Sequence, residues 1–168
     1  MGFKKTSDLI AVSFGIDESA PNTYTQEEIA LQLDVLNNEI FVVLAVDINL
    51  LPPDAVAGTN TSTAGSVTST SQTVIGNLDS TNTIATARDF IQAGGFVDGG
   101  VGFSRTAMES YTGDVDYIAL IATNNFFVSV QGLNNLAAKA STGRVWGYRA
   151  RADASTYAAL VQSEVLSA

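Results

Sequence analysis

The longest regular pattern of apolar and polar residues lies in the stretch EIFVVLAVDINLL, residues 39–51. Every second residue from Ile40 to Leu50 is a large aliphatic one, and neither Gly nor Pro occurs before Pro52-Pro53. A continuous apolar run can also be a buried helix, but alternation with a period of two favours a β-strand. We therefore predict one long strand, buried along one uninterrupted face and half covered on the other.

Similar alternation predicts further strands on both sides of this one. They span residues 8–16, 27–36, 117–123, 126–131 and 143–150. Segment 27–36 is ambiguous, because Thr25 and Glu28 also have the spacing of a helix capping box, but its alternation favours a strand. Two Asn pairs, Asn37-Asn38 and Asn124-Asn125, are expected to form hairpin turns, because Asn tolerates the positive φ of a tight turn.

Half of residues 59–86 are Ser or Thr, and the segment has a single charged residue, Asp79. Such a composition is also typical of a flexible linker. However, apolar residues such as Val67 and Ile84 recur within it, and Thr has good β propensity. We expect polar edge strands here that pack against neighbouring subunits.

The C-terminal stretch 152–168 is predicted to be a helix packed on the body of the protein. Asp153 is positioned to cap its first turn. The face expected to dock consists of Ala154, Tyr157, Ala158, Val161 and Val165. Leu160 and Leu166 lie off this face, and their expected exposure makes them candidates for contact with another subunit.

The predicted strands follow one another without intervening helices, which excludes a parallel α/β fold. Turn residues separate them at short intervals. The sequence therefore predicts an all-β fold, an antiparallel β-sandwich or jelly roll of about eight strands with a C-terminal α-helix. A chain of 168 residues fits a single jelly-roll-like domain, residues 1–168.

The composition removes the residue types on which most enzymes and metal sites depend. The chain has no Cys and no His, so disulfides, thiolate zinc sites and histidine bases are excluded. No Ser-x-x-Lys occurs that would let a lysine replace the histidine base. A glycosidase-type carboxylate pair stays formally open, but Trp146 is the only Trp available to line a sugar cleft. We expect no enzymatic activity and no cofactor.

The net charge of −9 is unevenly distributed along the chain. Ten carboxylates and no basic residue lie between Lys5 and Arg88, whereas six basic residues nearly balance seven acidic ones from Arg88 onward. An acidic chain repels nucleic acid and anionic membranes. No run approaches the roughly 20 apolar residues of a membrane span, and no signal peptide is recognisable. We expect no sequence-specific contact with nucleic acid, no transmembrane segment, and either a solvated acidic surface or attraction between copies.

Two short segments contain candidate binding residues. Asp114 and Asp116 are weak candidates for Ca²⁺ ligands, although neighbouring acids are common in turns without metal. The last predicted strand and its end combine arginines with large aromatics. These residues are Arg144, Trp146, Tyr148, Arg149 and Arg151. Such residues often anchor protein interfaces; the alternative is that the aromatics pack in the core and the arginines reach solvent.

With these strands laid out, the chain resembles the small single-jelly-roll capsid proteins of icosahedral viruses, in style those of viruses infecting archaea and bacteria. The resemblance is one of pattern, in NEIFVVLAVDINL, DYIALIATNNFFVSVQG and GRVWGYRARADASTYAALVQSEVLS. It implies a virion protein, made in the host cytoplasm, whose partners are copies of itself and other capsid proteins. Many RNA-virus capsid proteins have a basic N-terminal arm, and Lys4-Lys5 is all that this chain offers.

We therefore predict a structural protein, a self-assembling shell subunit and viral major capsid protein, which acts through complementary surfaces repeated by symmetry. The alternative is an extracellular filament or adhesin subunit, or a carbohydrate-binding β-sandwich module. A carbohydrate-binding module would have aromatic side chains aligned on one exposed face, and the low aromatic content of 8% argues mildly against it.

Overall fold

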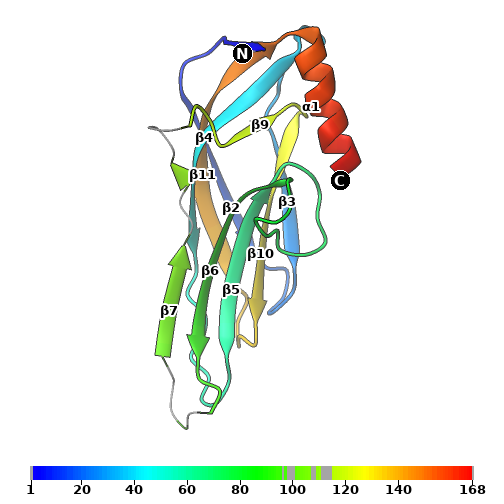
Figure 1. Ribbon diagram of the computed structural model, residues 1–168. Coiled ribbons are helices and arrows are strands. Elements are labelled where there is room, and N and C mark those ends of the chain that lie inside the picture. Colours follow the sequence, from blue (N-terminus) through cyan, green and yellow to red (C-terminus); the bar gives the residue numbers. More distant parts are fainter. Residues whose placement is uncertain (1, 96, 98–100, 107–108, 111–114, 168) are drawn as a thin grey trace.

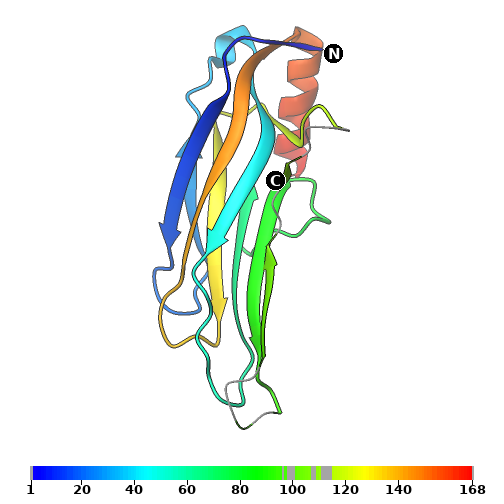
Figure 2. The same ribbon diagram turned by 90° about the vertical axis from the view of Figure 1, so that its left-hand side faces the viewer.

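The computed structural model describes residues 2–95, 97, 101–106, 109–110 and 115–167. These residues form two antiparallel sheets and one α-helix, α1 (Ala154–Ser167), which lies at one end of the sandwich (Figures 1 and 2). The six-stranded sheet contains β1 (Phe3–Lys5), β2 (Ile10–Asp17), β4 (Glu39–Leu50), β8 (Glu109–Ser110), β9 (Ala119–Ile121) and β11 (Ala140–Ala152). The five-stranded sheet contains β3 (Thr25–Ala30), β5 (Thr61–Thr68), β6 (Thr83–Gln92), β7 (Val101–Thr106) and β10 (Asn125–Leu133). The predicted all-β sandwich with a C-terminal helix is confirmed.

The order of the strands makes this sandwich a jelly roll. β1 and β2 lie end to end along β11, and β9 and β8 lie end to end along β4. With β8 and β9 counted as one strand, β2 pairs with β11, β3 with β10, β4 with β8/β9, and β5 with β6. The first four strands of the roll thus pair with the last four in reverse order, as in a long hairpin wound into two facing sheets. β7 is an additional strand beside β6.

The central strand β4 contains a β-bulge. Its neighbour β11 pairs Trp146 with Ala45 but Gly147 with Val43, so Leu44 is an extra residue on β4. Because successive side chains of a strand point to opposite faces, one extra residue exchanges the two faces beyond it.

The bulge divides the apolar residues of β4 between two clusters. The core between the sheets receives Phe41 and Val43 from one side of the bulge, and Val46, Ile48 and Leu50 from the other. Ile40 and Val42 lie on the opposite face. The sequence-based prediction of one uninterrupted buried face is therefore wrong, because the alternation restarts at Leu44.

The second cluster lies between α1 and the outer face of the six-stranded sheet. It contains Ile40, Val42, Ala122, Ala150 and Ala152, with partly buried side chains that include Tyr148, Tyr157, Leu160 and Val161. β4 is consequently buried on both faces next to α1, whereas Asp47 and Asn49, toward its other end, are exposed. Figure 2 looks onto β2, β11 and β4 with α1 behind them, so the half of the outer face farther from α1 is uncovered.

The start of α1 agrees with the prediction, but its docked face does not. The Asp153 side chain accepts hydrogen bonds from the Thr156 amide at 2.8 Å and the Ser155 hydroxyl at 3.0 Å, as expected of an N-cap. The side chains turned toward the sheets are Tyr157, Leu160, Val161 and Glu164. Ala154, Ala158 and Val165, which were expected to dock, are exposed. Leu160 and the buried Glu164 belong to the contact face. The helix is therefore rotated about its axis relative to the prediction.

The Ser/Thr-rich segment does not form edge strands. β5 lies in the middle of its sheet, between β10 and β6, and most of its small side chains are buried. The loop of residues 69–82 folds back over its outer face, where the Gly76 amide donates to the Ser66 hydroxyl at 3.2 Å and Ile75 is buried. Small residues are needed on the inner face too, since a side chain at Gly65 would collide with Leu50.

Neither predicted hairpin forms, because each Asn pair joins strands of different sheets. Strand β3 ends at Ala30, and residues 31–38, including a short 3-10 helix (Val35–Asn37), cross to β4 in the other sheet. Asn38 does adopt the expected left-handed conformation, with φ 57°. β9 and β10 likewise belong to different sheets. The residue types indicated turns correctly, but the pairing depends on the register of distant strands.

We predict that Gly147→Ala destabilises the protein, because the new Cβ would lie 2.2 Å from the Val42 carbonyl oxygen, beside the bulge. The expected loss in unfolding free energy is about 1–3 kcal/mol, measured by denaturant unfolding. Gly15→Ala is the matched control in the same sheet, since its Cβ would meet only a Thr142 methyl group at 3.7 Å. Equal stability of the two variants would contradict the close approach of β11 to β4 at the bulge.

Candidate interaction surfaces

The uncovered half of the outer face is a grid of nine residues on β2, β11 and β4. The rows across the three strands are Ala11–Trp146–Ala45, Ser13–Arg144–Asp47 and Gly15–Thr142–Asn49. Trp146 thus has an alanine on each side. The polar members line a shallow hollow of about 370 Å³ together with Trp146. Trp146 is partly exposed, and Trp is a residue type that anchors interfaces.

Arg144 and Asp47 are opposite charges at the centre of this grid. They are directly paired across β11 and β4, and both are exposed. Within the described parts of the chain, ion pairs are formed by Lys139 with Asp54 and by Arg149 with Glu39, and neither the Arg144 nor the Asp47 side chain has a hydrogen-bonding partner. Two charged groups are therefore available here for contact with another molecule.

The other two arginines singled out from the sequence have different surroundings. Arg149 donates to the Leu31 carbonyl at 3.0 Å and the Gln32 carbonyl at 3.2 Å, and forms a 3.5 Å ion pair with Glu39. It therefore holds the crossing between the sheets, where Gln32 has a positive φ of 55°. Arg151 is exposed and lies opposite Lys4 of β1.

Aromatic packing explains much of the remaining basic–aromatic cluster. Tyr148 is part of the cluster beneath α1, and the Lys5 ammonium lies 5.0 Å from the centre of its ring. Of the five basic and aromatic residues singled out on and just after the last strand, Arg144 and Trp146 lie together on the open half of the sheet.

A polar network joins three loops at the end of the sandwich opposite α1, here called the loop end. The buried Glu18 carboxylate accepts hydrogen bonds from the backbone amides of Thr23, Gly132 and Lys139, at 2.9, 2.9 and 2.7 Å. The buried Lys139 ammonium forms a 2.7 Å ion pair with Asp54. These contacts connect the loops that follow β2, β4 and β10, so the loop end is held in one conformation.

Asp54 and Asn135 complete this network. The second oxygen of Asp54 accepts hydrogen bonds from the amides of Leu136 and Ala137, at 2.9 and 3.1 Å. The hydrogen bond from Lys139 is the main cause that lowers the pKa of Asp54, and the two amides add to it. Asn135 is buried and donates to the Ser62 carbonyl at 2.8 Å.

Large apolar side chains are exposed around this fixed loop end. Leu136 is 77% exposed, Leu133 is 55% exposed and Leu51 is 47% exposed. They lie on the same loops that the network joins. Exposed apolar groups on a well-ordered loop are typical of protein contact sites, because little conformational entropy is lost when they are buried.

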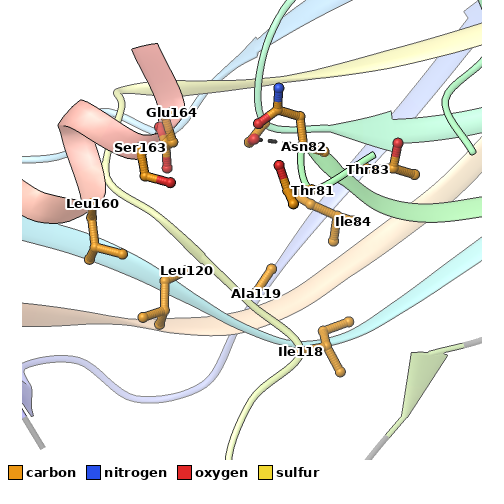
Figure 3. A pocket seen from close by; sticks show the side chains of 11 residues that line it. Thr81, Asn82, Thr83, Ile84, Ile118, Ala119, Leu120, Leu160, Ser163 and Glu164 are labelled. Carbon is orange, nitrogen blue, oxygen red and sulfur yellow. Dashed lines mark hydrogen bonds between the residues drawn. The ribbon is translucent and has the colours of Figure 1, made fainter. Parts of the chain in front are cut away.

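A second hollow lies between α1, β9 and the start of β6, and Figure 3 shows the side chains around it. Leu160, Ser163 and Glu164 line it from the helix, and Ile118, Ala119 and Leu120 from β9 and the residue before it. The buried Glu164 carboxylate accepts hydrogen bonds from the amides of Ala122 and Thr123, at 2.9 and 3.2 Å. These bonds fix α1 to the end of β9.

Two further sequence-based candidates are located, and one lies outside the described residues. Leu166, near the end of α1, is 75% exposed, as expected. Asp116 is exposed, whereas Asp114 falls outside the described part of the chain. Among the described residues no group of three or more acidic side chains is positioned to hold a metal ion, and no helix is long and apolar enough to cross a membrane.

Sequence reasoning missed Glu18, Asp54 and Glu164. Glu18 and Asp54 follow strands and read as ordinary turn acids, and Glu164 reads as part of a solvated helix face. Their partners are mainly backbone amides from distant segments, which residue types do not reveal. The only signal was Lys139, an isolated lysine between a run of small residues and the last strand.

Comparison with known proteins gives structural matches only. No protein-family model matches the chain, and no curated protein matches it in sequence. The chain is similar to a chain of desmodium yellow mottle tymovirus, with 12% identity, coverage of 88% of this chain and 91% of that one, and a TM-score of 0.30. It is also similar to a chain of turnip yellow mosaic virus, with 12% identity, coverage of 85% and 94%, and a TM-score of 0.29.

We predict that Asp54 stabilises the fold in a pH-dependent way. Its pKa is lower in the folded protein than the usual value near 3.8, so the ionised form favours folding. The stability of the natural protein relative to Asp54→Asn should be constant near neutral pH and should decrease as the pH falls below about 4. Denaturant unfolding between pH 7 and pH 3 measures this difference. A difference that grows on acidification would contradict the Lys139–Asp54 contact.

We predict that Glu164→Leu loosens α1. The substitution leaves the buried Ala122 amide and the partly buried Thr123 amide without their acceptor, at an expected cost of up to about 3 kcal/mol for each lost hydrogen bond. Amide hydrogen exchange should speed up at Ala122 and Thr123 and across α1. Gln162→Leu is the control. Gln162 also lies in α1 but is exposed, so this variant should leave these rates unchanged.

Proposed function

We propose that this chain is a self-assembling structural subunit of a viral shell, a major capsid protein without catalytic activity. The observation that carries the proposal is the loop end, where exposed leucines stand on loops fixed by a buried ionic network. The Lys139–Asp54 pair and Glu18 hold these loops from below, while Leu136 stays 77% exposed. A monomer gains little from this arrangement, whereas a repeated contact between copies would bury the leucines.

The architecture supports the same role. Jelly rolls occur in viral capsid, lectin and cupin domains, so the fold is compatible with a capsid subunit. A closed shell needs each subunit to present several contact surfaces. The loop end, the open half of the six-stranded sheet and the exposed tip of α1 around Leu166 are separate candidates for them.

The finer details of this role follow from the sequence and remain part of the proposal. The protein would reside in the virion, with copies of itself and other capsid proteins as partners. The net charge of −9 favours genome contact through another component. Infection of archaea or bacteria is a prediction from the sequence pattern alone.

A carbohydrate-binding module is the second candidate, and Trp146 favours it. The indole lies beside Arg144 and Asp47 on an open sheet face, and an aromatic ring flanked by polar groups suits a sugar. One aromatic residue makes a small platform, however. Binding of a glycan array by a monomeric chain would support this candidate over the shell.

We predict that the purified chain forms large multimers, and that Leu136→Gln weakens them. Size-exclusion chromatography with light scattering, and negative-stain micrographs of the main peak, measure the size and shape of the particles. Leu136→Met retains the apolar contact and is the matched control. Because residue 136 is exposed, both variants should unfold within about 0.5 kcal/mol of the natural protein. A natural chain that stays monomeric at all concentrations and salt levels would overturn the proposal.

A further inference from the structure

The open half of the six-stranded sheet is complementary to itself. Each of its three rows across β11 and β4 joins two unlike residues. Trp146 lies opposite the small Ala45, the cation Arg144 lies opposite the anion Asp47, and the hydroxyl of Thr142 lies opposite the amide of Asn49. The two residues of a row therefore differ in size in the first row, in charge in the second and in hydrogen-bonding group in the third.

These six residues lie on one face because β11 has no bulge between Thr142 and Trp146, and β4 has none between Ala45 and Asn49. The residue between each pair points into the core; Val145 and Val46 are fully buried there. Five of the six line the same hollow or border it on the sheet surface. α1 packs on the other half of the outer face, and no helix lies in front of these strands in Figure 2.

We propose that two copies of this chain pack against each other through this face, related by a two-fold axis that runs parallel to β11 and β4 and passes between them. Such an axis exchanges the positions of the two strands. It therefore places every residue of β11 opposite the β4 residue with which it pairs in its own chain. The inference rests on the proposed self-assembly and specifies one of its contacts.

The contacts that follow are each favourable. The Trp146 indole covers Ala45 of the second copy, where no large side chain competes for the space. Arg144 meets Asp47 of the second copy, and Asp47 meets Arg144 of the second copy, so both unpaired charges gain a partner. Thr142 and Asn49 offer hydrogen bonds at the rim. Facing sheets are about 10 Å apart, a distance that an indole and an arginine span.

Charge complementarity favours a second copy over a sugar or an unrelated protein. A neutral sugar would leave the two opposite charges without counter-charges. An unrelated partner would need the same alternation of charges in mirrored order, which a second copy supplies by symmetry.

Mixing two single charge reversals tests this contact. R144D gives a face with two acids, and D47R gives a face with two bases. Each variant alone opposes like charges in both pairs and should associate through this face at least about tenfold more weakly than the natural chain. A one-to-one mixture pairs an acidic face with a basic one, so association should return to within a few-fold of the natural value.

Sedimentation velocity and light scattering at low salt measure the association of each sample. R88D and E27R make the same charge changes at exposed positions on the other sheet, and should neither weaken association nor complement each other. Thermal unfolding confirms that every variant is folded. W146A should also lower association about tenfold or more, without rescue by mixing.

The outcomes separate this inference from the proposed function. Assembly of both reversals at the natural level, or failure of the mixture to associate better than either variant, would overturn the two-fold contact while leaving the shell proposal intact. A monomeric natural chain would overturn both. A third outcome would assign the face to sugar binding and overturn the inference. In that case a monosaccharide quenches the Trp146 fluorescence of the natural chain, and the variants R144D and D47R still assemble.

Discussion

The β-bulge at Leu44 is the feature on which the arrangement of the whole molecule depends. A regular β4 would place Ile40, Val42 and Leu44 on the same face as Val46, Ile48 and Leu50, and Phe41 and Val43 on the other. With the extra residue, both parts of the strand contribute to the core between the sheets, and Ile40 and Val42 lie on the opposite face, where they pack against α1. The bulge thus allows one strand to support two apolar clusters.

This division leaves the six-stranded sheet with two unlike halves. Next to α1 the outer face is apolar and covered, and Glu164 fixes the helix to β9 through backbone amides. Beyond the bulge the outer face is mixed in character, with Arg144 and Asp47 exposed and Trp146 partly exposed. The loop end adds a second exposed feature, because buried Glu18 and Lys139 hold the loops that present Leu136. Exposed groups on a fixed framework suit a subunit that acts by contact.

The sequence predicted the elements better than their partners. The alternation of apolar and polar residues predicted β2, β4, β10 and β11, and with them the all-β class. It does so because the pattern within a strand reflects which of its own residues are buried. It did not reveal the bulge, because Leu44 and Ala45 continue an unbroken apolar run. Asn38 showed where the chain turns but not that it crosses to the other sheet. Arg144 and Trp146 were found as candidates by residue type, whereas Arg149 proved to bind Leu31 and Gln32 carbonyls, a contact set by tertiary structure.

Trp146 is the only Trp in the chain, so its fluorescence reports on the open half of the sheet alone. The most direct test of association through this face is acrylamide quenching of that fluorescence across a dilution series, with the size of the particles measured in parallel. The account predicts weak quenching in the assembled protein and stronger quenching as it dissociates. Quenching that is equally strong in assembled and dissociated protein would contradict it.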